Sequence, residues 1–362
     1  MRLMMNRIVL VLVLIAVLAL GSSFVQAQGP EKLRVAMILA VPVGDAGWGL
    51  SHLVGLKYLE ARVPNVEVAY TESVPETAEA ERVLTEYARR GYKLLIAGSF
   101  GYMDSTLAVA KRFPEVVIIN CCQFRLAPNV ATYYVKDYEA GYLVGIIAGK
   151  MTKTNIIGYV AHMPTPNVIL NTNGFALGVR SVNPNAKIHL VWTQAWYNPA
   201  KEREGAESVM DVGADIVAEN TDSPAPVQAA ERRGKFSIGV YTDMSTFGPK
   251  GNLTSAVWNW GPIFVDVAQR VRAGTFKSTN YLWGLKEGGV TLAPFGRPVP
   301  ADVRQLVTER KQALIDGSLF IFKGPIRDQS GTLRVPAGKV LTHQEAWSLG
   351  FLVEGIVGTL PR

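Results

Sequence analysis

The feature that most constrains the fold is the regular alternation of strand-like and helix-like segments along the chain. Short apolar runs, the pattern of buried strands, occur at 33–40, 66–70, 94–97, 116–120 and 131–135. A second series of predicted strands follows at 156–160, 188–192, 216–219, 237–240 and 252–258. The helices expected between and after them span 48–62, 76–90, 105–112, 138–151, 168–182, 199–212, 223–233 and a stretch ending at 273. This alternation predicts doubly wound parallel sheets covered by helices, in two α/β lobes with a cleft between them.

Composition permits two such lobes, because 362 residues with 48 % hydrophobic and 19 % charged side chains can form two buried cores. The first 27 residues are not expected to belong to the fold. Arg2 and Arg7 precede an apolar run at 8–20, and Val25-Gln26-Ala27 matches a small-residue cleavage site. This pattern predicts a secretory signal peptide at 1–27. No cysteine near the site could carry a lipid anchor, so we expect a soluble protein exported to the periplasm.

Charge and cysteine content narrow the function classes further. The formal charge of +7 becomes 7 − 2 = +5 once the two signal-peptide arginines leave. The basic residues are scattered rather than clustered, which argues against a nucleic-acid surface. The two cysteines, Cys121 and Cys122, are adjacent, and consecutive Cα atoms lie about 3.8 Å apart, below the usual disulfide range. Two thiols are therefore favoured over a strained vicinal bridge.

Residues suited to ligand binding gather just after the predicted strands. Gly44-Asp45-Ala46-Gly47-Trp48 connects the first strand to the first helix, and its carboxylate and flat indole suit a flat polar ligand. An Asp-Gly turn with a core Trp is the alternative interpretation. Similar residues follow later strands: Ser99, Phe100, Trp196, Tyr197, Asn220, Thr221, Asp222, Tyr241, Asp243, Trp258, Asn259 and Trp260. Ligands bind at the carboxyl ends of parallel strands, so this distribution predicts a site in the cleft.

The sequence indicates catalysis less strongly than it indicates ligand binding. The chain has no nucleophile-elbow, P-loop or dinucleotide-binding motif, and no two histidines share metal-ligand spacing. The four are His52, His162, His189 and His343. Asp45, Asp222 and Asp243 could form an acid–base group, but no His or metal partner is evident. His52 is either an ordinary residue of the first helix or a residue behind the site. We expect a binding protein rather than an enzyme, with no cofactor and no metal.

Several motifs, taken in order, resemble the basic-membrane-protein (PnrA-like) family of substrate-binding proteins of ABC transporters, in particular its nucleobase-binding branch. The motifs are Gly44-Asp45-Ala46-Gly47-Trp48, Gly98-Ser99-Phe100-Gly101, Gly145-Ile146-Ile147-Ala148-Gly149-Lys150-Met151-Thr152, Val182-Asn183-Pro184-Asn185, Trp196-Tyr197-Asn198-Pro199-Ala200-Lys201-Glu202, Thr221-Asp222-Ser223-Pro224-Ala225-Pro226, Trp258-Asn259-Trp260-Gly261-Pro262 and Phe322-Lys323-Gly324-Pro325-Ile326. The resemblance covers nearly all of the mature chain.

The resemblance implies a type I periplasmic-binding fold, whose two lobes are joined by a three-segment hinge near 135–140, Trp258 and Thr291. The N-terminal lobe would comprise 28–137 with 259–290, and the C-terminal lobe 138–258 with 291–362. By the same resemblance, Trp48 and Trp196 sandwich a purine, and three carboxylates read its edge. The full set of implied ligand-binding residues is Gly44, Asp45, Trp48, Ser99, Phe100, Asn171, Trp196, Asn220, Asp222, Asp243 and Trp258.

Departures from the family pattern bear on the ligand. Trp258 stands where nucleoside-binding relatives have a ribose-contacting Lys, which favours a free base of the adenine, hypoxanthine or guanine class. Glu219-Asn220 replaces a Gln-His pair, and Glu219 either adds an acceptor at the ligand or pairs with a cation. The resemblance further implies a monomer that delivers its ligand to the membrane permease of an ABC importer. A nucleoside-binding protein and an exported nucleoside-acting hydrolase remain the alternatives.

Overall fold

The computed structural model describes residues 32–361, and the predicted signal peptide at 1–27 lies outside them. The described residues from Leu33 onward form one compact unit. Within the described part of the chain, no helix has the length and apolar character needed to cross a membrane.

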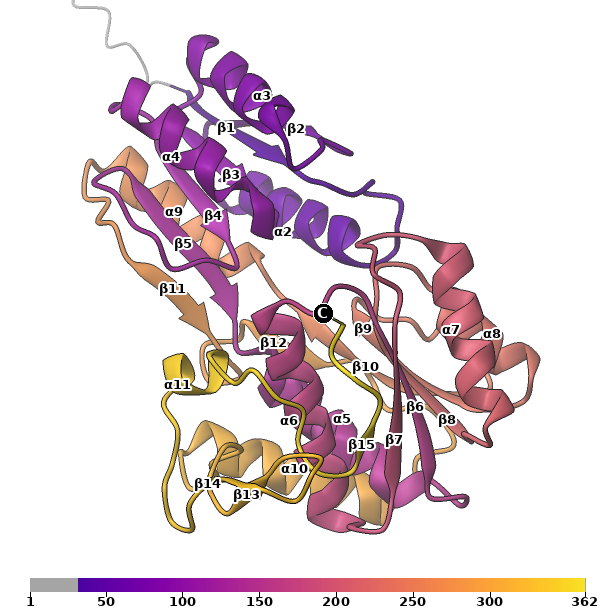
Figure 1. Ribbon diagram of the computed structural model, residues 1–362. Helices are drawn as coiled ribbons and strands as arrows, with labels where there is room; N and C mark the ends of the chain where they lie inside the picture. Colours follow the sequence, from indigo (N-terminus) through magenta and orange to yellow (C-terminus); the bar gives the residue numbers. More distant parts are fainter. Residues whose placement is uncertain (1–31, 362) are drawn as a thin grey trace, which may run out of the picture. The chain divides into compact units, whose positions relative to one another are not determined.

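Two sheets organise this unit (Figure 1). In the first, six parallel strands run in the order β11 (Asn280–Trp283), β5 (Val130–Val135), β4 (Val117–Cys121), β3 (Leu94–Ala97), β1 (Leu33–Ile38) and β2 (Val66–Thr71). In the second, the order is β12 (Val290–Leu292), β10 (Asn252–Trp258), β9 (Phe236–Tyr241), β8 (Ile216–Asn220), β6 (Ile156–Ala161), β7 (Lys187–Trp192) and β15 (Ile356–Val357). Only its edge strand β12 is antiparallel to its neighbour. The predicted doubly wound α/β architecture is confirmed.

Helices cover both faces of the first sheet, and successive residues of β1 show why. Val35 and Met37 pack in one core with Leu56 of α2 (Trp48–Arg62) and Ile263 of α9 (Gly261–Arg272). The alternate residues Ala36 and Ile38 pack in a second core with helices α3 (Ala78–Arg89) and α4 (Met103–Arg112). Because side chains alternate across a strand, apolar residues at every position require a helix on each face.

The second sheet is covered in the same way. Helices α5 (Asp137–Met151) and α6 (Pro166–Val182) lie on one face, and α7 (Pro199–Asp211) and α8 (Ala225–Arg232) on the other (Figure 1). Glycines let α5 and α6 meet at backbone distance. A Cβ at Gly145 would lie 2.2 Å from the Phe175 carbonyl oxygen, and one at Gly178 would lie 2.0 Å from that of Tyr142. Any side chain there would push the two helices apart.

The chain passes between the two sheets three times, after β5, after β10 and between β11 and β12. These passages coincide with the segments that the resemblance implies, near 135–140, Trp258 and Thr291. Strand β11, from late in the chain, therefore joins the first sheet at its edge beside β5.

Predicted helices agree with the structure to within about two residues at most ends, and the differences have local causes. The second helix begins at Ala78 rather than 76, because the hydroxyl of Thr77 accepts a hydrogen bond from the backbone of Glu79 as its N-cap. The helix expected from 168 begins at Pro166, a residue favoured in a first turn. No helix or strand is predicted from the sequence after 273. The elements found there besides β11, β12 and β15 are α10 (Ala301–Ile315), β13 (Ile326–Arg327), β14 (Leu333–Val335) and α11 (His343–Trp347).

Candidate functional site

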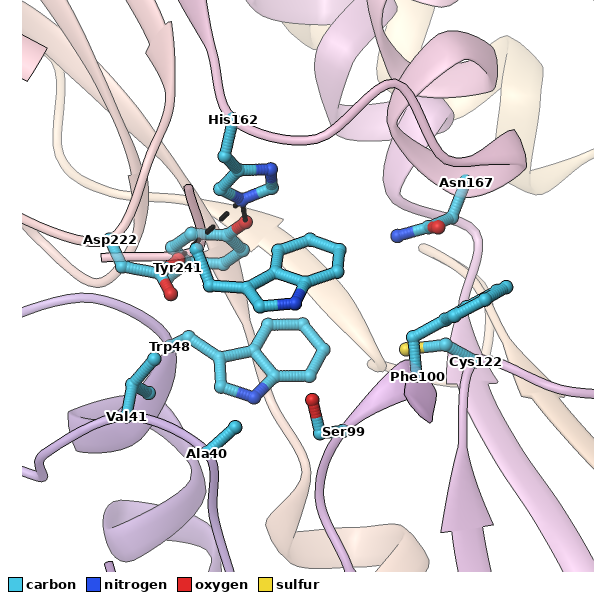
Figure 2. Close-up of a pocket in the computed structure, with 11 residues that line it drawn as sticks. Ala40, Val41, Trp48, Ser99, Phe100, Cys122, His162, Asn167, Asp222 and Tyr241 are labelled. Atoms are coloured by element: carbon cyan, nitrogen blue, oxygen red, sulfur yellow. Dashed lines mark hydrogen bonds and ion pairs between the residues drawn. The ribbon is translucent and has the colours of Figure 1, made fainter. Parts of the chain in front are cut away.

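A pocket lies among the segments that follow the carboxyl ends of strands in both sheets (Figure 2). Its lining residues are Ala40, Val41, Trp48, Ser99, Phe100, Cys122, His162, Asn167, Trp196, Asp222 and Tyr241. Seven strands, β1, β3, β4, β6, β7, β8 and β9, end at one of them or within four residues before it. The cavity volume is about 20 Å³, close to what one water molecule needs, so the walls lie near one another.

Trp48 forms one wall and is the first residue of α2. Its indole Nε1 donates a hydrogen bond to the Gly98 carbonyl oxygen over 2.9 Å. Trp258 and Trp260 pack edge-on against it, with ring centroids 5.5 Å and 5.6 Å away. This hydrogen bond and the two edge contacts fix the indole plane that faces the pocket.

Asp45 lies in the turn before Trp48 and is buried, but it does not line the pocket. Its carboxylate accepts hydrogen bonds from the backbone N–H groups of Gly47 (2.8 Å), Gly49 (2.6 Å) and Leu50 (3.0 Å). It therefore caps the first turn of α2, because the N-cap residue Gly47 has no side chain that could do so. Burial, and then the nearby Asp222 carboxylate, raise the pKa of Asp45 to about 7.

Trp196 contributes the second indole, from the loop after β7. Its Nε1 donates to Glu76 Oε2 over 3.2 Å. The other oxygen of Glu76 accepts from the Ser99 hydroxyl (2.6 Å) and the Gly101 backbone N–H (2.7 Å). Glu76 thus connects the Trp196 loop of the second sheet to the loop after β3 in the first.

Two further contacts beside the pocket join segments of the two sheets. The Thr242 hydroxyl, after β9, donates to the Ala46 carbonyl oxygen over 2.5 Å. Gly47 lies against the backbone of Asp222 so closely that a Cβ at Gly47 would be 2.4 Å from the Asp222 carbonyl oxygen. The absence of a side chain at Gly47 is therefore a condition for this close approach.

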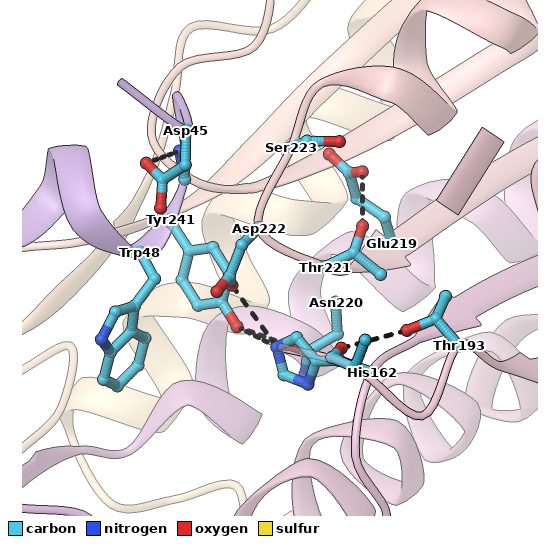
Figure 3. Close-up of polar contacts among 12 residues, drawn as sticks. Asp45, Trp48, His162, Thr193, Glu219, Asn220, Thr221, Asp222, Ser223 and Tyr241 are labelled. Atoms are coloured by element: carbon cyan, nitrogen blue, oxygen red, sulfur yellow. Dashed lines mark hydrogen bonds and ion pairs between the residues drawn. The ribbon is translucent and has the colours of Figure 1, made fainter. Parts of the chain in front are cut away.

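The polar end of the pocket is built on the second sheet (Figure 3). His162 Nε2 lies 2.8 Å from the Tyr241 hydroxyl and 3.5 Å from Asp222 Oδ1. The Tyr241 hydroxyl donates to Asn220 Oδ1 over 2.8 Å. Burial lowers the pKa of His162 to about 4, so its imidazole is neutral at pH 7. Burial, together with the nearby Glu202 carboxylate, raises the pKa of Asp222 well above its usual value.

Glu219, whose role the sequence left open, lies beside this cluster without lining the pocket. Its Oε2 accepts a hydrogen bond from the Thr221 hydroxyl over 3.1 Å, and burial raises its pKa well above the usual value. Its side chain thus bonds to a hydroxyl rather than to a cation.

The two cysteines are free thiols, as the sequence predicts, and Cys122 lines the pocket. The Sγ atoms of Cys121 and Cys122 lie 2.7 Å apart, and burial raises the pKa of both thiols. Across residues 32–361, no group of three His, Cys, Asp or Glu side chains is placed to hold a metal ion.

Comparison with known proteins identifies the family. Residues 32–321 match the family described as "ABC transporter substrate-binding protein PnrA-like". The chain belongs to this family. Among its relatives is a purine-binding protein of Brucella abortus, 40 % identical over 337 residues, which cover 93 % of this chain and 96 % of that protein. A putative ABC transporter glucose-binding protein of Haloferax volcanii is 31 % identical, covering 81 % of this chain and 75 % of that one.

Solved structures resemble this PnrA-like chain in fold. An ABC transporter solute-binding protein from Conexibacter woesei superimposes with a TM-score of 0.67 at 26 % identity, covering 79 % of this chain and 97 % of that one. Another from Aeropyrum pernix gives a TM-score of 0.71 at 21 % identity, covering 82 % and 93 %. The type I periplasmic-binding fold implied by the sequence is therefore shown.

The sequence-predicted site residues of this PnrA-like protein divide into two groups. Those that line the pocket together are Trp48, Ser99, Phe100, Trp196 and Asp222. Those that do not line it are Gly44, Asp45, Asn171, Asn220, Asp243 and Trp258. Asp243 is exposed and accepts a hydrogen bond from the Ser245 backbone. Asn171 and Asn220 are buried in hydrogen bonds behind the pocket.

Sequence reasoning missed His162 and Asn167 as lining residues, and it noted Tyr241 only as a strand-end residue. His162 and Tyr241 obey the rule that identified the others, since they lie directly after β6 and at the end of β9, whereas Asn167 is the second residue of α6. His162, two residues after a predicted strand, could have been found by applying that rule without first asking for a partner at metal-ligand spacing.

Proposed function

We propose that this chain is the periplasmic binding protein of an ABC importer and that it captures a purine nucleobase between Trp48 and Trp196. The observation that carries the proposal is that these two indoles, from segments of different sheets, line one pocket. Flat aromatic faces on two sides suit a planar heterocycle. The purine-binding relative, at 40 % identity over nearly the full length of both chains, supports the same ligand class.

Trp258 supports a free base over a nucleoside. It is 4 % exposed, and Tyr241 packs edge-on against it with ring centroids 4.5 Å apart. Its indole lies behind Trp48, at the position where the resemblance implies a ribose-contacting Lys, so this chain offers a sugar no ammonium group there. A pentose that reached this position would have to displace packed aromatic rings, at a cost in contacts that a base avoids.

Ligand entry requires the two walls to separate. A cavity of about 20 Å³ cannot hold a purine, and the contacts of Trp196 with Glu76 and of Thr242 with Ala46 hold the walls together. We propose that residues 28–137 with 259–290 form one lobe and 138–258 with 291–362 the other, and that bending at the three connecting segments opens and closes the site. The proposal also includes export by the signal peptide at 1–27, a monomeric state and docking to a membrane permease.

Isothermal titration calorimetry on protein refolded without ligand tests the function. Adenine, hypoxanthine and guanine are titrated beside adenosine and inosine, with glucose as a control ligand. We expect at least one free base to bind more tightly than either nucleoside. Tighter binding of adenosine or inosine than of every free purine would establish a nucleoside-binding protein instead. Time-dependent release of base from inosine during the same incubation would establish a hydrolase.

A further inference from the structure

The side-chain hydrogen-bond donors that line the pocket are already engaged inside the protein. Both indole N–H groups, the Ser99 and Tyr241 hydroxyls and the Asn167 amide each donate to a protein acceptor. The acceptors are Gly98 for Trp48, Glu76 for Ser99 and Trp196, Asn220 for Tyr241 and the Tyr134 hydroxyl for Asn167. A ligand therefore finds few side-chain donors on these walls.

Unpartnered polar atoms lie on the same walls. Asp222 Oδ1, Asn167 Oδ1 and His162 Nδ1 are buried and make no hydrogen bond. Leaving a buried polar atom unpaired is costly, so a bound ligand is the natural partner. The Asn167 oxygen accepts hydrogen bonds, as does the Asp222 oxygen when that carboxyl is ionised, whereas the role of His162 Nδ1 depends on which ring nitrogen carries the proton.

A chain of buried hydrogen bonds decides that question, beginning at Asp137 at the start of α5. Its carboxylate accepts from the Tyr134 hydroxyl and from the Asn171 Nδ2, each over 3.0 Å. The Asn171 amide must therefore turn its oxygen the other way, where it accepts the Tyr159 hydroxyl proton over 2.7 Å. With that proton committed, the Tyr159 hydroxyl can only accept from its next neighbour.

That neighbour is Asn220 on β8, which pairs with Ala161 and so lies diagonally beside Tyr159 on the same face of the sheet. Burial raises the pKa of Tyr159, and the Asn220 side chain opposes that rise, as a hydrogen-bond donor to the hydroxyl does. The Asn220 NH₂ thus faces Tyr159, and its oxygen accepts the Tyr241 hydroxyl proton over 2.8 Å. Tyr241 in turn can only accept, so the proton between it and His162 belongs to His162 Nε2, 2.8 Å away. Asp222 Oδ1, 3.5 Å from the same nitrogen, favours a proton there as well. His162 Nδ1 is left as a bare acceptor.

We propose that His162 is a specificity-determining residue whose Nδ1 is held as an acceptor by this chain, and that with Asp222 and Asn167 it selects a ligand edge rich in N–H donors. This inference rests on the proposed function and specifies its substrate class as aminopurines. An amino group can donate to these acceptors, whereas an oxo group in its place sets two acceptors against each other. We expect aminopurines to bind about 10-fold more tightly than oxopurines, or more.

The first test measures the tautomer directly, in the ligand-free protein, by long-range ¹H–¹⁵N correlation of the histidine side chains at pH 7. With four histidines in the chain, comparison with His162→Gln assigns the signal. We expect the neutral form protonated at Nε2. A form protonated at Nδ1 would overturn the inference, whatever the ligand proves to be.

The second test compares matched ligands by calorimetry: adenine with hypoxanthine, and 2,6-diaminopurine with xanthine. Tyr159→Phe interrupts the chain without touching the pocket, so we expect it to reduce the amino-to-oxo affinity ratio at least about 3-fold and to introduce the second His162 tautomer. The control is Tyr142→Phe, which changes a buried tyrosine on α5. It should change neither the amino-to-oxo affinity ratio nor the His162 tautomer. If oxopurines bind the wild type as tightly as aminopurines, or if the two variants behave alike, the inference is wrong. If no purine binds at all, the proposed function fails instead, while the tautomer result still stands.

Discussion

Replacing Gly47 by alanine tests whether binding requires the close approach of the two walls. The added Cβ would lie 2.4 Å from the carbonyl oxygen of Asp222, 2.8 Å from its carbonyl carbon and 2.9 Å from its Cα. All three are backbone atoms, so no side chain can turn aside to relieve the clash. The segments must separate, so the proposed closed form loses stability relative to an open one.

Overpacking of this kind typically costs about 1–3 kcal/mol. If that cost applies to the closed form alone, ligand affinity falls by a factor of about 5–150. The matched control is Gly350→Ala, because a Cβ at Gly350 has open space around it. Calorimetry with adenine measures the affinity, and small-angle X-ray scattering measures the compaction on ligand addition, which Gly47→Ala should reduce. An affinity and a compaction equal to those of wild type would refute the idea that this contact belongs to the binding-competent state.

Three further predictions concern stacking, packing and pH. Trp196→Ala removes one proposed stacking face and should weaken adenine binding about 5–150-fold, as the loss of about 1–3 kcal/mol of base stacking implies; Trp192→Ala, outside the pocket, is the control in the same calorimetric assay. Trp260 is fully buried and donates to the Ser51 hydroxyl over 3.0 Å, so Trp260→Ala should lower the free energy of unfolding by about 3–5 kcal/mol in urea; a loss below 1 kcal/mol would contradict the packing described. Burial raises the pKa of Asp45 from 3.8 to about 7. Between these pH values the folded state holds a proton that the unfolded state has lost. The free energy of unfolding should therefore fall as pH rises from about 4 to 7. Urea midpoints at pH 5 and 7.5 should therefore differ more in wild type than in Asp45→Asn, and equal differences would show that Asp45 does not titrate in this range.

The sheets were predictable because their signal is local. Apolar runs such as 94–97, buried throughout as β3, need only a few neighbouring residues to be recognised. The chain after 273 carries no such signal. Helix α10 buries only Val303 and Val307, and α11 has five residues begun by a capping box at Thr342 and Glu345. Their positions depend on tertiary packing that no short window contains.

The candidate site was predictable by position but not by orientation. A residue that follows a parallel strand lies near the cleft, which is why Trp48, Trp196 and Asp222 were found. Whether its side chain then faces the ligand or the helix behind depends on local hydrogen bonds. Asp45 turns away because three N–H groups of the first helical turn lie within its reach. Trp258 turns into an aromatic cluster for the same kind of reason, since other rings surround it.

The glycine-lined contact between α5 and α6 affects the order in which a ligand is recognised. The hydrogen bonds from Asp137 on α5 through Tyr134 to Asn167 on α6 begin and end on this helix pair, which is too tightly joined to slide. The acceptor oxygen of Asn167 is accordingly in place before a ligand arrives. We expect an incoming molecule to contact this preformed part of the site first and the Trp48 side only afterwards. A molecule that lacks matching hydrogen-bond donors is then released before the site closes.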